Sequence, residues 1–158
     1  MRMNAVVRAD SAPSWVAFAL DGLRLALPLA SVSRIVHAAS ITPLPDAPDA
    51  VAGALDVAGT VMAVYDLRRR LRLPPRPMRL EDQIIIAQTS RRALALIVDR
   101  ALGVVDGMPA QNDEVSGVLT TPDGLVLIPD LETFLSPADD AALESALRIA
   151  EVRCKQTR

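Results

Sequence analysis

The sequence predicts an all-β fold, a barrel or a sandwich, from two observations. Short apolar segments with strand-like alternation recur along the chain, and turn signals separate them at regular spacing, which is typical of all-β domains. Only one stretch, at the C-terminus, has the pattern of a longer helix, and no repeated alternation of strands and helices supports a parallel sheet. Closure of the strands into barrels would also remove exposed strand edges, which otherwise promote aggregation.

The first part of the chain predicts a hairpin followed by irregular structure. In residues 15–28 the larger apolar side chains recur at every second position on both sides of Asp21-Gly22, which is a strong hairpin signal. Residues 29–37 are compatible with one or two helical turns. Residues 41–48 contain three prolines, which excludes a regular helix or a central strand. Residues 49–54 are compatible with a short helix.

The stretch LDVAGTVMAVYDLRRRL predicts two strands and a capped helical turn. Residues 55–58 and 60–65 are apolar and rich in β-branched residues, and Gly59 between them marks a turn, a bulge or a close backbone approach. Asp66 is an N-cap residue for a helical turn over residues 66–71. We therefore expect the apolar part to form strands, and we expect Asp66 to pair with a nearby arginine.

The remaining sequence predicts further short strands and a terminal helix. Pro137 and the acidic residues after it match the first turn of a helix. In order, we expect a linker at 74–77, strands at 84–89, 93–99 and 102–105, a polar loop at 107–117, a hairpin turning at 122–124, a helical turn at 131–136 and a helix from 137.

The composition predicts a soluble, cytoplasmic protein. A chain of 158 residues usually forms one domain or two small intertwined ones and buries enough surface to fold without disulfides. Its single cysteine, Cys154, excludes an internal disulfide framework or a cysteine zinc site. The apolar runs are far shorter than the ~20 residues that span a bilayer. We therefore expect contact with a membrane only through a partner.

No set of residues with the pattern of a catalytic or cofactor site is found in the sequence. The one histidine, His37, has no neighbouring nucleophile, and the chain lacks a phosphate-binding glycine loop, a GxSxG sequence and an HExxH sequence. Asp46 and Asp49 have a spacing that could touch a metal, but turns use the same residues. We expect no enzyme activity, no cofactor and no metal.

Six arginines within twelve residues raise the alternative of a nucleic-acid site. These are Arg68, Arg69, Arg70, Arg72, Arg76 and Arg79. Three consecutive arginines on a helical turn do not line one groove, and only Tyr65 lies near as a stacking aromatic. The formal net charge of −2 also argues against a protein built to hold nucleic acid. We therefore expect a solvated face, and a nucleic-acid-binding barrel remains only the remote alternative.

The order of motifs resembles the CheW-like domains of bacterial chemotaxis coupling proteins, over about residues 15–135. Each motif is weak alone, but together they are specific. The matching stretches are Val32-Ser33-Arg34-Ile35, LPDAP (44–48), GALDVAG (53–59), MAVYDLR (62–68), LIVDRALGVVD (96–106) and a closing hairpin over 123–131.

The resemblance implies two intertwined five-stranded SH3-like barrels with a hydrophobic groove between them. Such proteins couple chemoreceptors to the histidine kinase CheA: one barrel packs against the regulatory domain of the kinase, and receptor tips bind along the groove. The implied domains are a flexible N-terminus at 1–13, a CheW-like domain of two sub-barrels at 14–136, and a C-terminal helix and tail at 137–158. The implied partner-binding residues are Val32, Arg34, Val36, Gly53, Asp56, Ala58 and Gly59.

Three positions depart from the family pattern. The family has a glutamate where this chain has Arg34, an asparagine at Asp56 and an arginine at Ala58. The alternative within the family is therefore a divergent member that serves another chemosensory pathway, such as one controlling pili, or that binds a different partner.

The alternation also predicts which apolar residues form the barrel core. These are Val16, Phe18, Leu20, Val61, Val64, Ile85, Leu96, Val98 and Leu127. Leu143 and Leu147 are four residues apart and share a helix face, so we expect the terminal helix to pack through Leu143, Leu147 and Ile149 or a subset of them.

Overall fold

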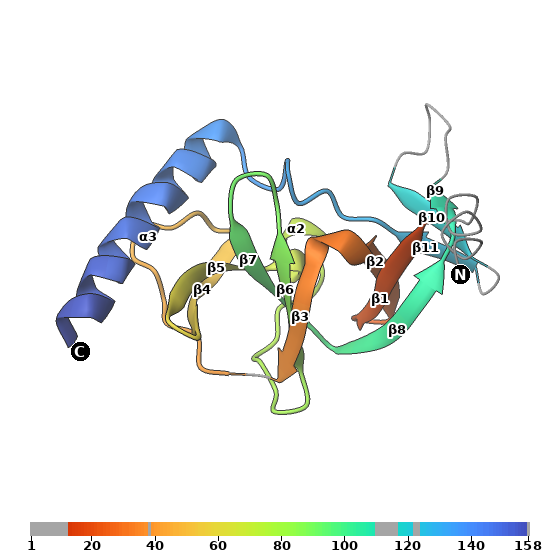
Figure 1. Ribbon diagram of the computed structural model, residues 1–158, viewed down its shortest axis with the longest axis horizontal. Helices are drawn as coiled ribbons and strands as arrows, with labels where there is room; N and C mark the ends of the chain where they lie inside the picture. Colours follow the sequence, from red (N-terminus) through yellow and green to blue (C-terminus); the bar gives the residue numbers. More distant parts are fainter. Residues whose placement is uncertain (1–12, 38, 110–116, 122–123, 158) are drawn as a thin grey trace, which may run out of the picture.

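The computed structural model describes residues 13–37, 39–109, 117–121 and 124–157, and the side chains of 153–157 are not described. Within these residues the chain forms two mainly antiparallel sheets, one of six strands and one of five. They pack side by side, and one long helix lies at the far end of the molecule (Figure 1). The predicted all-β class with two sub-barrels is confirmed, and one sheet has a sixth strand.

The six-stranded sheet takes its strands from both ends of the chain. Its order is β8-β1-β2-β11-β10-β9. The bounds are β1 Ser14–Leu20, β2 Leu23–Pro28, β8 Arg100–Asp106, β9 Met108–Pro109, β10 Val118–Thr121 and β11 Gly124–Leu127. The sixth strand is the short β9, which pairs with β10 at the sheet edge.

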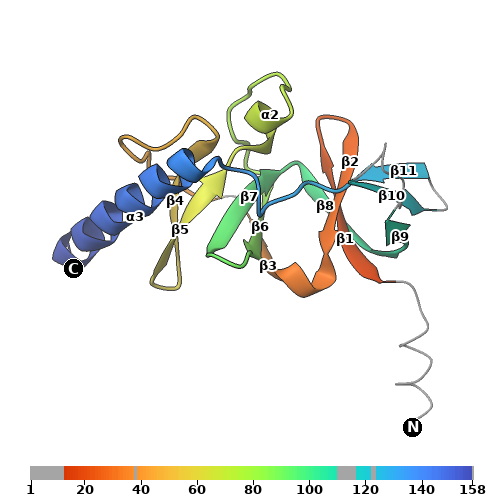
Figure 2. The same ribbon diagram turned by 90° about the horizontal axis from the view of Figure 1, so that it is seen from above.

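The five-stranded sheet is formed from the middle of the chain, in the order β3-β6-β7-β5-β4. Its bounds are β3 Val32–His37, β4 Val51–Val57, β5 Thr60–Tyr65, β6 Gln83–Gln88 and β7 Ala93–Val98. The 3-10 turn η1 Leu29–Ser31 leads into it, and the short helix α2 Leu67–Arg70 follows β5. The chain therefore enters the second sheet after β2 and returns to the first after β7, which interleaves the two units (Figure 2).

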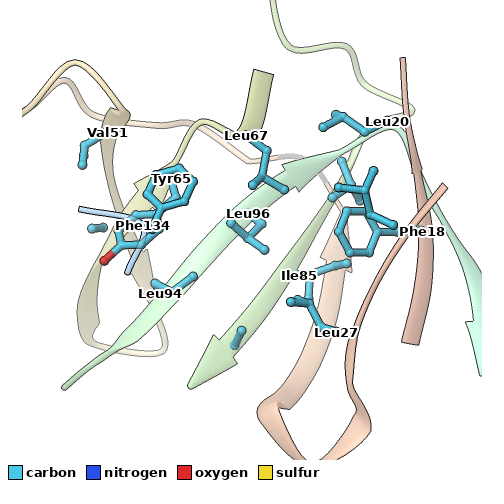
Figure 3. Close-up of a cluster of buried hydrophobic side chains, with 14 of the residues drawn as sticks. Phe18, Leu20, Leu27, Val51, Tyr65, Leu67, Ile85, Leu94, Leu96 and Phe134 are labelled. Carbon is cyan, nitrogen blue, oxygen red and sulfur yellow. The ribbon is translucent and has the colours of Figure 1, made fainter. Parts of the chain in front are cut away.

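The largest apolar cluster lies where the two sheets face each other. Phe18, Leu20 and Leu27 come from the six-stranded sheet, and they meet Ile85 and Leu96 from the other (Figure 3). Smaller clusters fill the interior of each unit: Leu55, Met62, Val64, Ile84, Ile86 and Ala95 in one, and Trp15, Ala26, Leu119 and Val126 in the other. Burial of this apolar surface is the main force that holds the sheets together.

Most of the predicted core is confirmed, with two differences. Val16, Phe18, Leu20, Val64, Ile85, Leu96 and Val98 are buried. Val61 is only partly buried. The prediction for Leu127 is wrong, because this side chain is 38% exposed and the adjacent Val126 is fully buried. Side chains of a strand alternate between faces, so the one-residue difference moves Leu127 to the outer face.

Two short helical predictions are wrong, and a third is confirmed only over its first three residues. Of residues 29–37, only Leu29–Ser31 is helical, and Val32–His37 is a strand paired with β6. The predicted short helix at 49–54 is replaced by β4, which begins at Val51 and pairs with β5. Residues 131–135 form bends and turns. In both strands, β-branched residues and pairing with a neighbouring strand outweigh a short helical pattern.

The terminal helix α3 Pro137–Thr157 begins at the predicted residue and packs on β5. Leu143 is fully buried, Leu147 is partly buried and Ile149 is 55% exposed, so the subset of Leu143 and Leu147 carries the packing. No helix in the described residues combines the length and the apolar character needed to cross a bilayer.

Ion pairs and an aromatic contact hold the start of α3. Arg92 bonds to Asp140 at 2.6 Å and to the hydroxyl of Tyr65 at 3.1 Å, and it also pairs with Glu144. The ring of Phe134 stacks on Tyr65 with a centroid distance of 4.6 Å. The first turns of α3 are therefore fixed to β5 and to the turn before β7.

Candidate functional site

Strand β3 carries three of the seven predicted partner-binding residues at the edge of its sheet. Arg34 is exposed, and Val32 and Val36 are partly buried. Val32 packs against the cluster between the sheets, and Val36 packs against the interior cluster of its own unit. Only β6 pairs with β3 among the described strands, so the outer edge of β3 is uncovered and Arg34 is available to a partner.

Gly53 has a structural role, because another backbone segment passes directly over it. A Cβ at this position would lie 2.5 Å from the carbonyl oxygen of Thr42 and 2.7 Å from Cγ2 of Ile41. Thr42 forms a bridge to Ala54 with two backbone hydrogen bonds. The glycine therefore lets the proline-rich segment close against β4, and Gly53 itself is buried.

The other three predicted residues form the turn between β4 and β5. Ala58 and Gly59 are the two central residues, with φ angles of 51° and 89°, and Val57 pairs with Thr60. Positive φ at both positions is the signature of a type I′ hairpin turn. The carboxylate of Asp56 accepts a hydrogen bond from the backbone N–H of Gly59 at 2.9 Å. The turn is exposed, and Asp56 helps to shape it.

The strand β3 and the β4–β5 turn lie on the same side of the molecule in both views (Figures 1 and 2). Strand β3 and the β4–β5 hairpin lie at opposite edges of the five-stranded sheet. Val36 and Val57 pack against the same interior cluster. Three of the seven residues therefore lie on the edge strand β3, and the other four lie on β4 or in the turn that follows it.

Strand β8 offers a second uncovered edge, which the sequence analysis did not single out. Only β1 pairs with β8 in the described part of the chain. Leu102 and Val104 are 37% and 59% exposed, and Ile35 on β3 is 37% exposed. The sequence predicts a strand over residues 102–105, but a local pattern does not show which strands lie at the edge of a sheet.

An apolar groove of about 530 Å³ lies between the two sheets. Trp15, Leu27 and Pro28 line it from one sheet, and Gln88 and Thr89 line it from the end of β6. Its far wall is the segment 128–132, where Glu132 accepts hydrogen bonds from the N–H and hydroxyl of Ser90. None of the seven predicted residues lines this groove, so it is a separate surface.

Most arginines of the run form ion pairs with aspartate or glutamate side chains of the same chain. Asp66 caps α2 by accepting from the N–H groups of Arg68 and Arg69, and its carboxylate also pairs with the Arg69 side chain at 3.3 Å, as the sequence predicts. The side chains of Arg68 and Arg76 are only 11% and 19% exposed and pair with aspartates. Among the described residues, only Arg70 and Arg72 of the six arginines lack an ion pair.

The more buried carboxylates form ion pairs with arginines. The hydrogen bond from Arg76 lowers the pKa of Asp82 below its usual value, and this outweighs the opposing effect of burial. Burial raises the pKa of Asp99, but bonds from the Asp21 N–H, Arg76 and Arg68 outweigh it and lower the pKa. His37 is exposed at the end of β3. No group of three metal-ligating side chains occurs in the described residues.

Comparison with known proteins identifies the family. The CheW-like domain model matches residues 14–139. The chain is 25% identical to a probable chemotaxis protein CheW of Rhizobium etli, over 80% of this chain and 90% of the relative. It is 27% identical to the chemotaxis protein CheW of Thermotoga maritima, over 57% of this chain and 59% of that protein.

A solved structure shares the fold. The scaffolding protein TtCheW from Thermoanaerobacter tengcongensis matches with a TM-score of 0.70 and 24% identity, over 81% of this chain and 95% of that chain. The family model covers most of the described residues and both sheets. The chain therefore belongs to the CheW-like domain family.

Proposed function

We propose that this chain is a non-catalytic adaptor of chemotaxis-type signalling that links chemoreceptors to the histidine kinase CheA. The observation that carries the proposal is that β3 and β8, one terminal strand of each sheet, have outer edges that no other described strand covers. Each bears exposed apolar side chains. Such edges present free backbone groups and apolar surface, which suit docking of another protein.

Membership of the CheW-like family and the named relatives support this proposal. An adaptor needs complementary surface and no reactive group, and the most buried described carboxylates, among them Asp82 and Asp99, are paired with arginines. We assign receptor contact to β3 and the β4–β5 turn, and kinase contact to one of the two barrels.

The altered residues change the charge of the receptor surface. Arg34 is exposed on β3 where the family pattern has glutamate, and Ala58 occupies the turn where the pattern has arginine. Charge patterns of this kind govern partner choice more than raw affinity. The chain should therefore bind a receptor tip from the same organism well. It should bind weakly to an ordinary receptor tip, meaning one whose coupling protein has the family pattern at these three positions.

A titration with purified fragments tests the proposal. The chain should bind the CheA regulatory domain and a receptor tip from the same organism. It should not modify either fragment chemically. The triple variant Arg34→Glu, Asp56→Asn and Ala58→Arg should bind an ordinary receptor tip about tenfold more tightly, which corresponds to about 1.4 kcal/mol. Absence of binding to both native fragments would refute the adaptor role. Tight binding of an ordinary tip by the parent would refute the role assigned to the altered charges.

A further inference from the structure

The return of the chain from the five-stranded to the six-stranded sheet occurs at a single residue. Strand β7 ends at Val98 and β8 begins at Arg100, so only Asp99 lies between them. Pairing with β1 places β8 within its own sheet, and Asp99 is the residue through which β8 joins the five-stranded sheet.

Asp99 is bonded to groups on both sides of the crossing. On the six-stranded side, its N–H donates to the carbonyl of Ala19 at 3.0 Å, and its Oδ2 accepts from the N–H of Asp21 at 2.8 Å. On the other side, its Oδ1 accepts from Nη2 of Arg68 at 2.8 Å and also from Arg76. Arg68 lies on α2, directly after β5. One carboxylate thus joins the β1–β2 turn to the end of β5.

The partners of Asp99 are themselves fixed. Arg76 makes a two-point ion pair with Asp82, with both bonds at 2.8 Å, and the Asp82 side chain is only 1% exposed. Arg68 also pairs with Asp21 at 3.3 Å. One residue into β8, the N–H of Ala101 donates to the side chain of Gln83 on β6 at 2.6 Å. We call Asp99, Arg68, Arg76, Asp82 and Asp21 the Asp99 network.

The Asp99 network can fix the orientation of one sheet relative to the other, which the apolar cluster between them does not do by itself. Apolar burial is non-directional and allows two packed faces to slide or rotate. Charge-assisted hydrogen bonds, and a two-point arginine–carboxylate pair above all, require a defined geometry. The arginines are mostly shielded from solvent, so the surrounding protein holds the geometry.

We propose that Asp99 is a positioning residue that sets the placement of β8 relative to β3, and so shapes the surface that the two edge strands offer to a partner. The predicted effect on partner binding rests on the proposed adaptor function. The placement of β8 is a property of the free chain and does not depend on that function. The hydrogen bonds of Asp99 go to Ala19, Asp21, Arg68 and Arg76 and to none of the seven predicted contact residues, so Asp99 acts through the strand that follows it.

The distance between the sheets tests the positioning directly. Spin labels would be attached through Thr60→Cys on β5 and Thr120→Cys on β10, both exposed, in a Cys154→Ser background. Pulsed electron resonance should give a narrow distance distribution for this parent and a broader or shifted one for Asp99→Asn. Arg68→Met, which keeps the apolar stem of the side chain, should show the same change and serves if Asp99→Asn does not fold.

Two control variants separate positioning from general loss of stability. Asp46→Asn makes the same chemical change at an exposed residue with a φ of 64°, which asparagine adopts readily. Ile84→Val removes one methyl from the core of the five-stranded unit, where Ile84 is fully buried. Neither should change the distance distribution. An unchanged distribution in both Asp99→Asn and Arg68→Met, or an equal change in Ile84→Val, would overturn the proposal.

Binding to the native receptor fragment then tests the consequence. If only one molecule in ten keeps the arrangement of β8 and β3 that binds the receptor, the affinity for the receptor fragment falls about tenfold. We expect this fall for Asp99→Asn but not for Ile84→Val. A parent that binds neither fragment would refute the adaptor function alone, because the distance measurement still decides the positioning. Full affinity in a variant with a broadened distribution would refute the effect of positioning on binding.

Discussion

Ala58 is a non-glycine residue in the left-handed region, with φ of 51°, at the first central position of the β4–β5 turn. This conformation costs an L-residue about 1 kcal/mol. Asparagine tolerates it better and is preferred with glycine in type I′ turns. The turn therefore keeps a residue that is not the most stable choice, at a position that we assign to partner contact.

Replacing Ala58 should change stability in a direction set by the backbone. Ala58→Asn should raise the free energy of unfolding by about 0.5–1 kcal/mol, and Ala58→Val should lower it, because a β-branched side chain fits this region poorly. Urea unfolding of the two variants and the parent measures both effects. The opposite order of the two variants would contradict the positive φ at this position.

Helix α3 depends on one buried leucine. Leu143 is fully buried, whereas Ile149 on the same helix is 55% exposed. Leu143→Ala should lower the free energy of unfolding by about 2–5 kcal/mol, the usual cost of such a cavity. Ile149→Ala removes a similar side chain from the exposed part and should cost far less. Equal effects in urea unfolding would mean that the helix does not pack on β5.

The anchor of α3 should depend on pH through Asp140. The hydrogen bond from Arg92 lowers the pKa of Asp140 below its usual value. A carboxylate with a lowered pKa contributes stability that is present above its unfolded pKa of about 3.9 and is lost as pH falls through the folded value. The stability difference between the parent and Asp140→Asn should therefore be largest near pH 6 and shrink below about pH 4.

Urea unfolding across this pH range measures the difference. Subtraction of the variant isolates Asp140 from Asp82 and Asp99, whose pKa values are also lowered. The control is Asp139→Asn, the adjacent residue, which is exposed and makes no ion pair among the described residues. A constant difference between parent and Asp140→Asn down to pH 3 would exclude the ion pair as the anchor.

At the scale of the whole molecule, the ion pairs of the arginine run lead to a prediction about nucleic acid. Arg68 and Arg76 are held by aspartates and are not free to contact phosphates. We expect at most weak binding of oligonucleotides at physiological salt. Real phosphate contact would give a linear fall of log affinity with log salt. Sub-micromolar binding that is lost in Arg69→Ala with Arg70→Ala would contradict this expectation.

Local patterns in the sequence were enough for the elements whose signals are local. The Asp21-Gly22 hairpin, the turn at Gly59, the Asp66 cap and the helix start at Pro137 are all where the sequence predicts them. Each depends on backbone dihedral preferences or on hydrogen bonds within a few residues. The strand pattern predicts the all-β class, and the family motifs added the division into two interleaved units.

Long-range packing decided the rest, because it depends on residues that a local pattern does not contain. Residues 32–37 became a strand because β6 pairs with them. Strands β7 and β8 both look apolar, but β7 lies between two strands, and β8 lies at an edge with Val104 exposed. The bond between the Asp21 N–H and Asp99 joins residues 78 positions apart. Only the crossing of the chain between two sheets brings them together.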